Sequence, residues 1–255
     1  MRDAIHLEWQ LFLLALRYLT RVPVPAGLPS SDDLMIRATK YHPVVGVVVG
    51  AVGAAVLWLA ALVLPWGAAV ILSLAATLIV TGAFHEDGLA DAVDGLAGGS
   101  DRDTVLRIMA DARLGKHGGM ALGLVLALKL VLLASLNLPD AMAALVAGHA
   151  MGRMGAVHII ATTRYARSEG MQAIITAITP DGYRVALAML AVLLAGMMLW
   201  FGWVATGYAL VLSILLGQLF RAWFQRKLGG YTGDCLGGVQ QLCELGVYLG
   251  LAIVL

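Results

Sequence analysis

The sequence predicts an all-α protein, a polytopic transmembrane helix bundle of about six or seven spans, and three observations carry this prediction. Of the 255 residues, 60% are hydrophobic and only 13% are charged, whereas soluble domains are about a quarter charged. Several stretches without charge also reach the roughly 20 residues that a helix needs to cross a bilayer. Stretches such as 44–64 are apolar at nearly every position, so they lack the alternation of a β-barrel strand. The lipid bilayer is therefore an expected partner.

The apolar stretches define the expected spans, and the last of them is the weakest because it contains Glu244. We predict them at 43–64, 67–84, 118–138, 141–162, 185–206, 207–224 and 236–255. Before the first span, apolar residues recur at helical spacing opposite polar ones, which predicts an amphipathic helix at the membrane surface or, alternatively, a soluble lid. No linker or repeat is present, so we expect residues 1–255 to form a single integral-membrane domain.

The basic residues predict how the bundle is oriented. Of the 17 lysines and arginines, 15 lie before the first span or in the segments 85–117, 163–184 and 221–227, and the turns between these segments contain none. Short loops rich in lysine and arginine stay in the cytoplasm, so the N-terminus and all long loops are predicted to be cytoplasmic. The net charge of +1 gives no reason to expect nucleic-acid binding.

Acidic residues are concentrated between positions 86 and 111, directly after the second predicted span. Asp87, Asp91 and Asp94 follow the spacing i, i+4, i+7, which places them on one face of a helix. Like charges at that spacing repel one another, and a hard divalent cation removes the repulsion. Carboxylates are the ligands that Mg²⁺ shares with substrate phosphates. A solvated acidic face is the alternative, but the neighbouring glycines favour a ligand site.

Two further segments supply groups suited to phosphate. Arg113 and Lys116 lie among glycines just before the third span and could bind phosphate oxygens, although basic residues there could also serve only to set topology. The segment 229–238 contains five glycines and Asp234. It predicts a tight cytoplasmic turn that closes around a nucleotide or a corrinoid, or that is merely a loop between helices. It lacks the GK[ST] ending of a Walker loop.

Ionisable side chains within the predicted spans need partners, because charge is costly in hydrocarbon. Lys129, His149, Arg153 and Glu244 fall in this class, and a structural ion pair or a substrate-lining role would explain them equally well. The two cysteines lack the spacing of a metal or redox site and are expected to be packing residues.

The motifs together resemble the cobalamin synthase family. The resemblance is carried by His85-Glu86-Asp87-Gly88-Leu89-Ala90-Asp91 with Asp94-Gly95, by 111–119, by Leu19 to Pro25, by 43–46 and by 228–234, in the expected order over essentially the whole chain. It implies a magnesium-dependent adenosylcobinamide-GDP ribazoletransferase of the bacterial inner membrane with its active site facing the cytoplasm. Such an enzyme joins adenosylcobinamide-GDP to α-ribazole or α-ribazole 5′-phosphate and releases GMP, late in cobalamin biosynthesis. A homo-oligomer is compatible with this expectation.

Under that reading each candidate residue receives a role. The expected metal ligands are the carboxylates Asp87, Asp91, Asp94 and Asp111. Arg113, Lys116 and Asp234 are expected to bind substrate. The proton of the attacking hydroxyl would pass to His85, to His117 or to one of the carboxylates, so the catalytic set is His85, Asp91, Asp94 and His117.

Two other protein classes share some of these features. Membrane-bound CDP-alcohol phosphotransferases also hold metal with clustered aspartates, and Asp91-x-x-Asp94-Gly95 matches the start of their pattern, but Ala97-Gly98-Gly99 stands where an Ala-Arg pair is expected. Release of CMP from a CDP-alcohol would identify that class. A transporter would use ionisable residues near the membrane midplane, whereas the densest chemistry here lies in the loops. Uptake into sealed vesicles without GMP release would identify a transporter.

Overall fold

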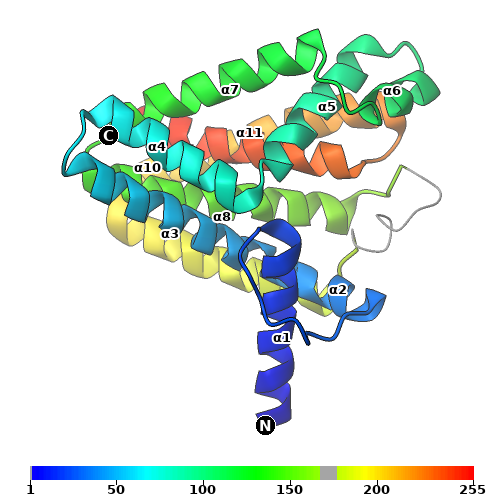
Figure 1. The fold of residues 1–255 in the computed structure, drawn as a ribbon, viewed down its shortest axis with the longest axis horizontal. Helices are drawn as coiled ribbons and strands as arrows, with labels where there is room; N and C mark the ends of the chain where they lie inside the picture. Colours follow the sequence, from blue (N-terminus) through cyan, green and yellow to red (C-terminus); the bar gives the residue numbers. More distant parts are fainter. Residues whose placement is uncertain (1, 167–176) are drawn as a thin grey trace.

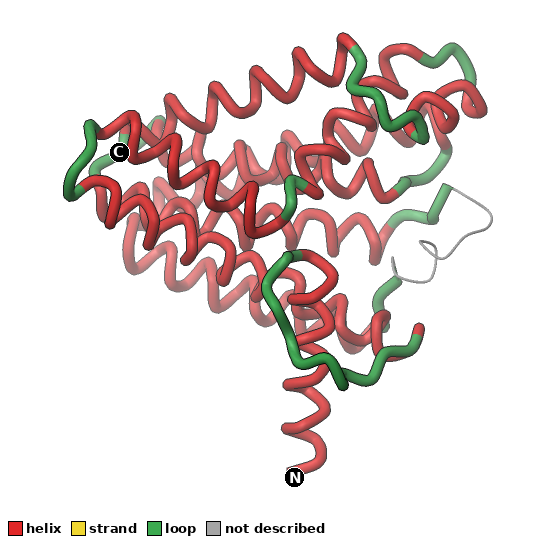
Figure 2. Tube along the Cα trace, in the orientation of Figure 1, coloured by secondary structure: helices red, strands yellow, loops and turns green. Residues whose placement is uncertain are grey.

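The chain is a bundle of α-helices in a computed structural model that describes residues 2–166 and 177–255 (Figure 1). Figure 2 shows helices joined by loops and no strand in this part of the chain, where the sole β-pairing is an isolated bridge between Tyr165 and Tyr231. The predicted all-α fold is thus confirmed. The helices are α1 (Arg2–Leu19), α2 (Asp32–Ala38), the 3-10 helix η1 (Thr39–Tyr41), α3 (His42–Ala61), α4 (Trp66–Thr81), α5 (Phe84–Gly98), α6 (Arg102–Met109), α7 (Lys116–Ser135), α8 (Leu138–Thr162), α10 (Pro180–Leu228) and α11 (Gly233–Ala252).

Each of the seven expected spans coincides with a helix or with half of one. By length and composition, four helical segments of the described chain can cross a membrane, namely 32–61, α7, α8 and α10, and α4 with α5 would be a fifth if that bent pair is one span. The number of spans and the side that each loop faces stay predictions.

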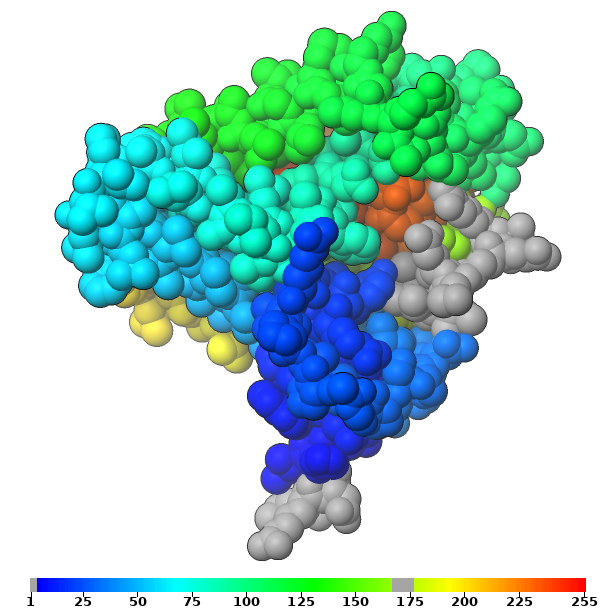
Figure 3. Space-filling model, in the orientation of Figure 1, coloured from blue at the N-terminus to red at the C-terminus, as the bar shows by residue number. Residues whose placement is uncertain are grey.

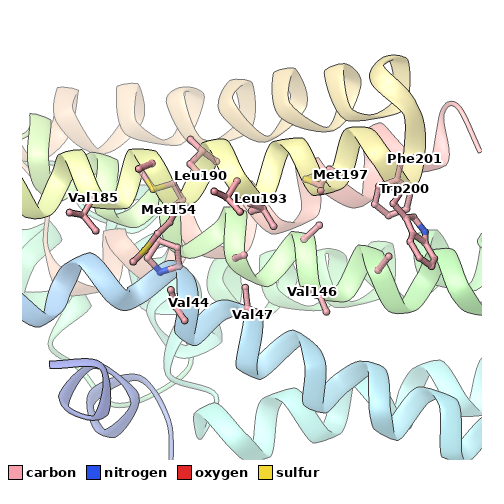
Figure 4. Close-up of a pocket in the computed structure, with 18 residues that line it drawn as sticks. Val44, Val47, Val146, Met154, Val185, Leu190, Leu193, Met197, Trp200 and Phe201 are labelled. Atoms are coloured by element: carbon pink, nitrogen blue, oxygen red, sulfur yellow. The ribbon is translucent and has the colours of Figure 1, made fainter. Parts of the chain in front are cut away.

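Helix α10 is broken into two parts. Its 49 residues would measure roughly 74 Å as a straight helix, more than twice the thickness of a bilayer's hydrocarbon. At Gly202 the backbone leaves the helical region (φ 80°, ψ 167°), and the chain turns there and runs back (Figure 4). The expected division between residues 206 and 207 therefore lies four residues too late, because the glycine that permits the positive φ is Gly202 and not Gly207.

A sharp bend joins α4 to α5. Gly82 and Ala83 both have positive φ (69° and 58°), and the two helices meet at 87°. Residues in the left-handed region end a helix, so α5 does not continue in the direction of α4. The acidic helix α5 is thereby laid across the bundle.

Helices α8 and α11 form the centre of the bundle. They contact each other, and each packs on α10, while α3 crosses α8. At that crossing a Cβ on Gly46 would meet the backbone of His149, and one on Gly50 would lie 2.6 Å from the carbonyl oxygen of Leu145. Gly46 and Gly50 therefore serve helix packing, because only glycine allows such close approach.

The N-terminal helix α1 packs against this bundle and also extends away from it (Figure 3). Leu11 and Leu14 are fully buried against a cluster that includes Val45 and Val49 of α3. Glu8 anchors the helix, since it accepts a hydrogen bond from the Tyr41 hydroxyl at 2.7 Å and pairs with Lys40 at 2.6 Å. The predicted helix is confirmed, and its place at the membrane surface stays a prediction.

Candidate active site

Helix α5 carries the predicted aspartates and presents them at three depths. Asp87 is exposed, Asp91 is partly buried and Asp94 is 7% exposed. The helical prediction for this segment is confirmed. The carboxylates of Asp87 and Asp94 both act on Asp91 electrostatically, as expected for side chains on one face of a helix.

Asp94 holds the start of α7. Its Oδ2 accepts the backbone N–H of Gly115 at 2.8 Å, and its Oδ1 accepts those of His117 and Gly118 at 3.1 and 2.9 Å. A Cβ on Gly115 or Gly118 would collide with this carboxylate, which explains the glycines of the motif. The first N–H groups of a helix lack partners and attract anions. Asp94 therefore acts here as a structural anion, and its role as a metal ligand stays a prediction.

Asp234 joins the acidic face from a distant part of the sequence. Helix α11 crosses α5 where Gly88 and Gly237 face each other, and a Cβ on Gly88 would lie 3.2 Å from the carbonyl oxygen of Asp234. Partial burial, then the carboxylates of Asp87, Asp234 and Asp94, raise the pKa of Asp91 to about 6. Asp234 was expected to bind substrate; the structure places it close enough to Asp91 for its charge to act there, and its role stays a prediction.

The glycine-rich turn before α11 is shorter than predicted. Gly229 ends α10 with a positive φ of 67°, and α11 already begins at Gly233, capped by the Thr232 hydroxyl, which accepts the N–H of Cys235 at 3.3 Å. The turn therefore comprises residues 229–232. Gly237 and Gly238 lie inside α11 because close helix contacts require them there, against His85 and Phe220 respectively.

The predicted phosphate-binding residues lie in the exposed loop that leads into α7. The Arg113 guanidinium, with a side chain 88% exposed, donates to both oxygens of Asp111, and its Nη2 lies 2.7 Å from Oδ2. These hydrogen bonds hold the pKa of Asp111 at about 2. Lys116 is exposed in the first turn of α7. Asp111 thus pairs with Arg113, and the expected roles of all three residues stay predictions.

The two candidate proton acceptors lie in different surroundings. His85 is 5% exposed and lines a small cavity in the interior of the bundle, together with Arg153. Burial, then the neighbouring Arg153 guanidinium, lower the pKa of His85 well below its usual range, so this imidazole is a weak base. His117 is partly exposed beside Asp94. The backbone N–H of His117 thus contacts Asp94 of the acidic face, whereas the His85 side chain is buried in the bundle.

The described carboxylates suit magnesium without forming a closed cage. Among the residues that the structure describes, no group of three or more His, Cys, Asp or Glu side chains converges tightly enough to enclose a metal ion. Magnesium does not need such a group, because it binds through one or two carboxylates, waters and substrate phosphates. Partial burial and, after it, repulsion by the neighbouring carboxylates raise the pKa of Asp91, and this repulsion fits a site that gains from a divalent cation.

A buried polar network connects α5, α7, α8 and α11, and the sequence predicted only some of its members. The Lys129 ammonium lies 2.7 Å from both Glu244 Oε1 and Gln241 Oε1, and Gln241 donates to Glu86 at 2.7 Å. His149 pairs with the other oxygen of Glu244 at 3.2 Å. The ion pair confirms one of the two expectations for the intramembrane residues. Gln241 was not predicted to take part, although two adjacent glutamines at 240–241 in an apolar span were the available signal. Glu86 was expected to lie off the metal-facing arc of its helix.

A larger cavity lies away from this chemistry. Its volume is about 780 Å³, and it is lined by apolar side chains of α3, α8 and the first half of α10, including Met154, Leu193 and Phe201 (Figure 4). It contains none of the candidate site residues. Its lining includes no charged side chain that could bind a metal or a phosphate, so the candidate site is the acidic face of α5.

Known proteins match this chain over almost its full length. The model of the cobalamin-5-phosphate synthase family matches residues 11–252. The chain belongs to this family. Proteins named adenosylcobinamide-GDP ribazoletransferase are similar to it: that of Shewanella frigidimarina is 40% identical, with 97% of this chain and 95% of the relative covered, and that of Leptothrix cholodnii is 43% identical, with 98% and 97% covered. No solved structure matches.

Membership in the cobalamin-5-phosphate synthase family confirms the resemblance read from the motifs. The relative from Ralstonia nicotianae is 43% identical, with 96% of this chain and 94% of the relative covered, and it bears the same name. The matched residues include the acidic helix α5, the start of α7 and the start of α11. The match favours this family over the CDP-alcohol phosphotransferases and the transporters.

Proposed function

We propose that this chain is a magnesium-dependent adenosylcobinamide-GDP ribazoletransferase of the bacterial inner membrane, with its acidic face toward the cytoplasm. The observation that carries the proposal is that α11 brings Asp234 to the crossing with α5, where its charge and that of Asp87 act on Asp91, in a chain whose relatives bear that name. The acidic helix begins at the end of an apolar helix. A site there can join a substrate held at the membrane to one that arrives from water.

The reaction transfers a phosphoryl group between two oxygens. A hydroxyl of the ribazole attacks the phosphorus nearest the aminopropanol arm of the corrinoid. The bond from this phosphorus to the oxygen that bridges the diphosphate breaks, and GMP leaves with the bridging oxygen. The hydroxyl proton passes to a base of the protein or to solvent. In such transfers the protein mainly positions the groups and neutralises developing charge.

The described residues can divide this work. Asp87, Asp91 and Asp234 would hold magnesium, which supplies positive charge beside the diphosphate. Arg113 and Lys116 extend from the loop at the start of α7 and can reach phosphate oxygens. His117 lies beside Asp94 at the same junction and is the better placed of the two histidines to accept the hydroxyl proton.

Product formation by the purified chain tests the proposed function. The protein in detergent is incubated with adenosylcobinamide-GDP, α-ribazole 5′-phosphate and magnesium, and chromatography follows the corrinoid product and GMP. We expect both products in equal amounts, and neither when a chelator replaces magnesium. Product formation that persists in chelator would refute the magnesium requirement. CMP release from a CDP-alcohol without a corrinoid product would refute the assigned reaction.

Arg113→Ala should slow the reaction without destabilising the protein. The expected loss in the rate of GMP release is about tenfold to a hundredfold, because a guanidinium directed at phosphate acts on transition-state charge. Its exposed pairing with Asp111 contributes little to folding. Arg37→Ala is the matched control, since Arg37 pairs at 3.6 Å with Asp33 and has no proposed role. Equal rates for the two variants would leave Arg113 as a topology residue.

The orientation can be tested at Ser100, an exposed residue between α5 and α6. In a variant with Cys235 and Cys243 replaced by serine, a cysteine placed at position 100 should react with a membrane-impermeant maleimide only after the inner membrane is opened, because 15 of the 17 basic residues sort to that side. Labelling in cells whose inner membrane is intact would reverse the proposed orientation.

A further inference from the structure

Arg153 is a buried cation that forms no ion pair within 4 Å with a carboxylate of the described residues, although the charges of Glu244 and Glu86 act on it from farther away. The side chain lies in the middle of α8 and the residue is 1% exposed. Its Nη1 donates to the His149 carbonyl oxygen at 3.1 Å, whereas Nε and Nη2 have no hydrogen-bond partner among the described residues. An unpaired buried charge is costly, so an anion that accepts hydrogen bonds from Nε and Nη2 would stabilise this side chain.

Neither of the two nearest buried carboxylates, Glu244 and Glu86, bonds to the guanidinium of Arg153 in the described part of the chain. Both oxygens of Glu244 are taken, by Lys129 and Tyr248 at 2.7 and 2.9 Å and by Gln240 and His149 at 2.7 and 3.2 Å. Glu86 accepts a hydrogen bond from Gln241 through Oε1, whereas its Oε2 is buried without a hydrogen-bond partner in the described part of the chain. No ion pair within 4 Å joins Glu86 to Arg153 among the described residues, although the charge of Glu86 acts on the guanidinium. The guanidinium is therefore available to a ligand.

A small cavity adjoins the guanidinium. Its volume is about 40 Å³, and since one water molecule needs roughly 10–15 Å³, it has room for a group of about three water molecules, the size of one phosphate. Arg153, His42 and His85 line it, together with Gly233 and Gly237 of α11. Helix α11 spans 20 residues, and the N–H groups of its first turn favour an anion at this end. Two independent features, the guanidinium and the helix start, thus favour the same kind of ligand.

The cavity lies beside the acidic face. His85 belongs to the first turn of α5, two residues before Asp87, and Gly233 precedes Asp234 in α11. The cavity and the acidic face lie on either side of the crossing of α5 and α11 at Gly88 and Gly237. The two helices are close there, since a Cβ on Gly237 would lie 2.9 Å from the carbonyl oxygen of His85. Figure 3 shows the start of α11 (orange) reaching the surface between α5 (teal) and the N-terminal segment (blue).

We propose that the cavity formed by Arg153, His85 and the start of α11 is a phosphate-binding subsite, which takes one phosphate group of the nucleotide-bearing or ribazole substrate. The assignment of the phosphate to a substrate rests on the proposed function. A guanidinium in a buried site binds phosphate through short, charge-assisted hydrogen bonds. Arg153 would hold one phosphate group while the carboxylates on the other side of the crossing hold magnesium.

Phosphate binding without metal tests this subsite separately from catalysis. The full chain in neutral detergent is melted in chelator across a titration of inorganic phosphate, with sodium chloride at matched ionic strength. Without metal the acidic face repels anions, so saturable stabilisation reports the cavity. Phosphate also stabilises folded proteins nonspecifically, and the readout is therefore the difference between the parent and Arg153→Gln. We expect phosphate to raise the Tm of the parent, and we expect the variant to bind it at least about tenfold more weakly.

A second variant covers the case in which Arg153→Gln does not fold. Ala156 lines the cavity and is 8% exposed, so Ala156→Leu fills the space while every charge remains, and it should also abolish the phosphate effect. Absence of a saturable effect in the parent, or equal effects in the parent and both variants, would overturn the subsite. These results leave magnesium-dependent GMP release by the parent unaffected, so the two proposals fail independently.

A parallel titration distinguishes the source of the phosphate. Phosphatidylglycerol added to the same detergent micelles presents a phosphate group from a lipid, and inorganic phosphate represents the soluble substrates. Stabilisation by inorganic phosphate that depends on Arg153 supports the proposal. Stabilisation that depends on Arg153 and occurs only with phosphatidylglycerol would overturn the assignment to a substrate, because the cavity would then bind a headgroup.

Discussion

Asp91→Asn is expected to lower the rate of GMP release by at least about a hundredfold at limiting magnesium. The substitution keeps the size of the side chain and one carbonyl oxygen. It removes the negative charge of Asp91, on which the carboxylates of Asp87, Asp94 and Asp234 act. Magnesium affinity should fall with it, since hard cations bind carboxylate more strongly than amide oxygen. The measurement is GMP release across a magnesium titration.

The same substitution should not destabilise the protein without metal. Burial and three neighbouring carboxylates raise the pKa of Asp91 from 3.8 to about 6, so its ionised form is disfavoured in the folded state. Above pH 6 the folded protein carries this unfavourable charge, and Asp91→Asn relieves it. Between pH 6 and 3.8 the folded protein of the parent binds the proton more readily than the unfolded chain, so the advantage of the variant should disappear as the pH falls through that range.

Thermal melting in chelator at pH 7.5 and pH 4 measures this effect. Asp103→Asn is the matched control, because Asp103 is an exposed aspartate of α6 that pairs only loosely with Arg102 at 3.7 Å, and it should change neither activity nor stability. Normal turnover of Asp91→Asn at limiting magnesium would exclude the acidic face as the catalytic metal site. A much lower Tm for Asp91→Asn at pH 7.5 would instead identify Asp91 as a structural residue.

The largest loss of stability is expected from Lys129→Met. The ammonium of Lys129 is 2.7 Å from Glu244, and the two side chains are 2% and 0% exposed. Methionine preserves the shape of the side chain but leaves a buried carboxylate without its closest cation, and breaking a buried pair in this way costs about 3–5 kcal/mol of unfolding free energy. Because α7 and α11 are held together at this point, their contact should weaken.

A double-mutant cycle distinguishes this pairing from general packing. Glu244→Gln in the Lys129→Met background removes the stranded charge, so the double variant should be more stable than Lys129→Met alone. Unfolding in detergent provides the free energies. Arg184→Met is the matched control, since its pair with Asp181 is 79% and 88% exposed and should contribute little. Equal losses in Lys129→Met and the double variant would show that the charge of Glu244 is balanced by other groups.

The fold class and the acidic face could be predicted from the sequence because both depend on local spacing. Apolar stretches of about 20 residues identify helices wherever they pack, and each of the seven expected spans falls on a helix or half of one. The i, i+4, i+7 spacing of Asp87, Asp91 and Asp94 sets their common face through the helical repeat alone. Family membership then followed from motifs that are contiguous in the chain.

Tertiary structure decided how these local elements combine. Asp234 is 143 residues from Asp91 in the numbering, and they meet only because Gly88 and Gly237 let α11 approach α5. The same packing assigns Asp94 to the start of α7 and leaves Arg153 beside a cavity instead of in an ion pair. Residue spacing determines which side chains share a helix face, whereas helix contacts, which depend on distant small residues, determine which charges become neighbours.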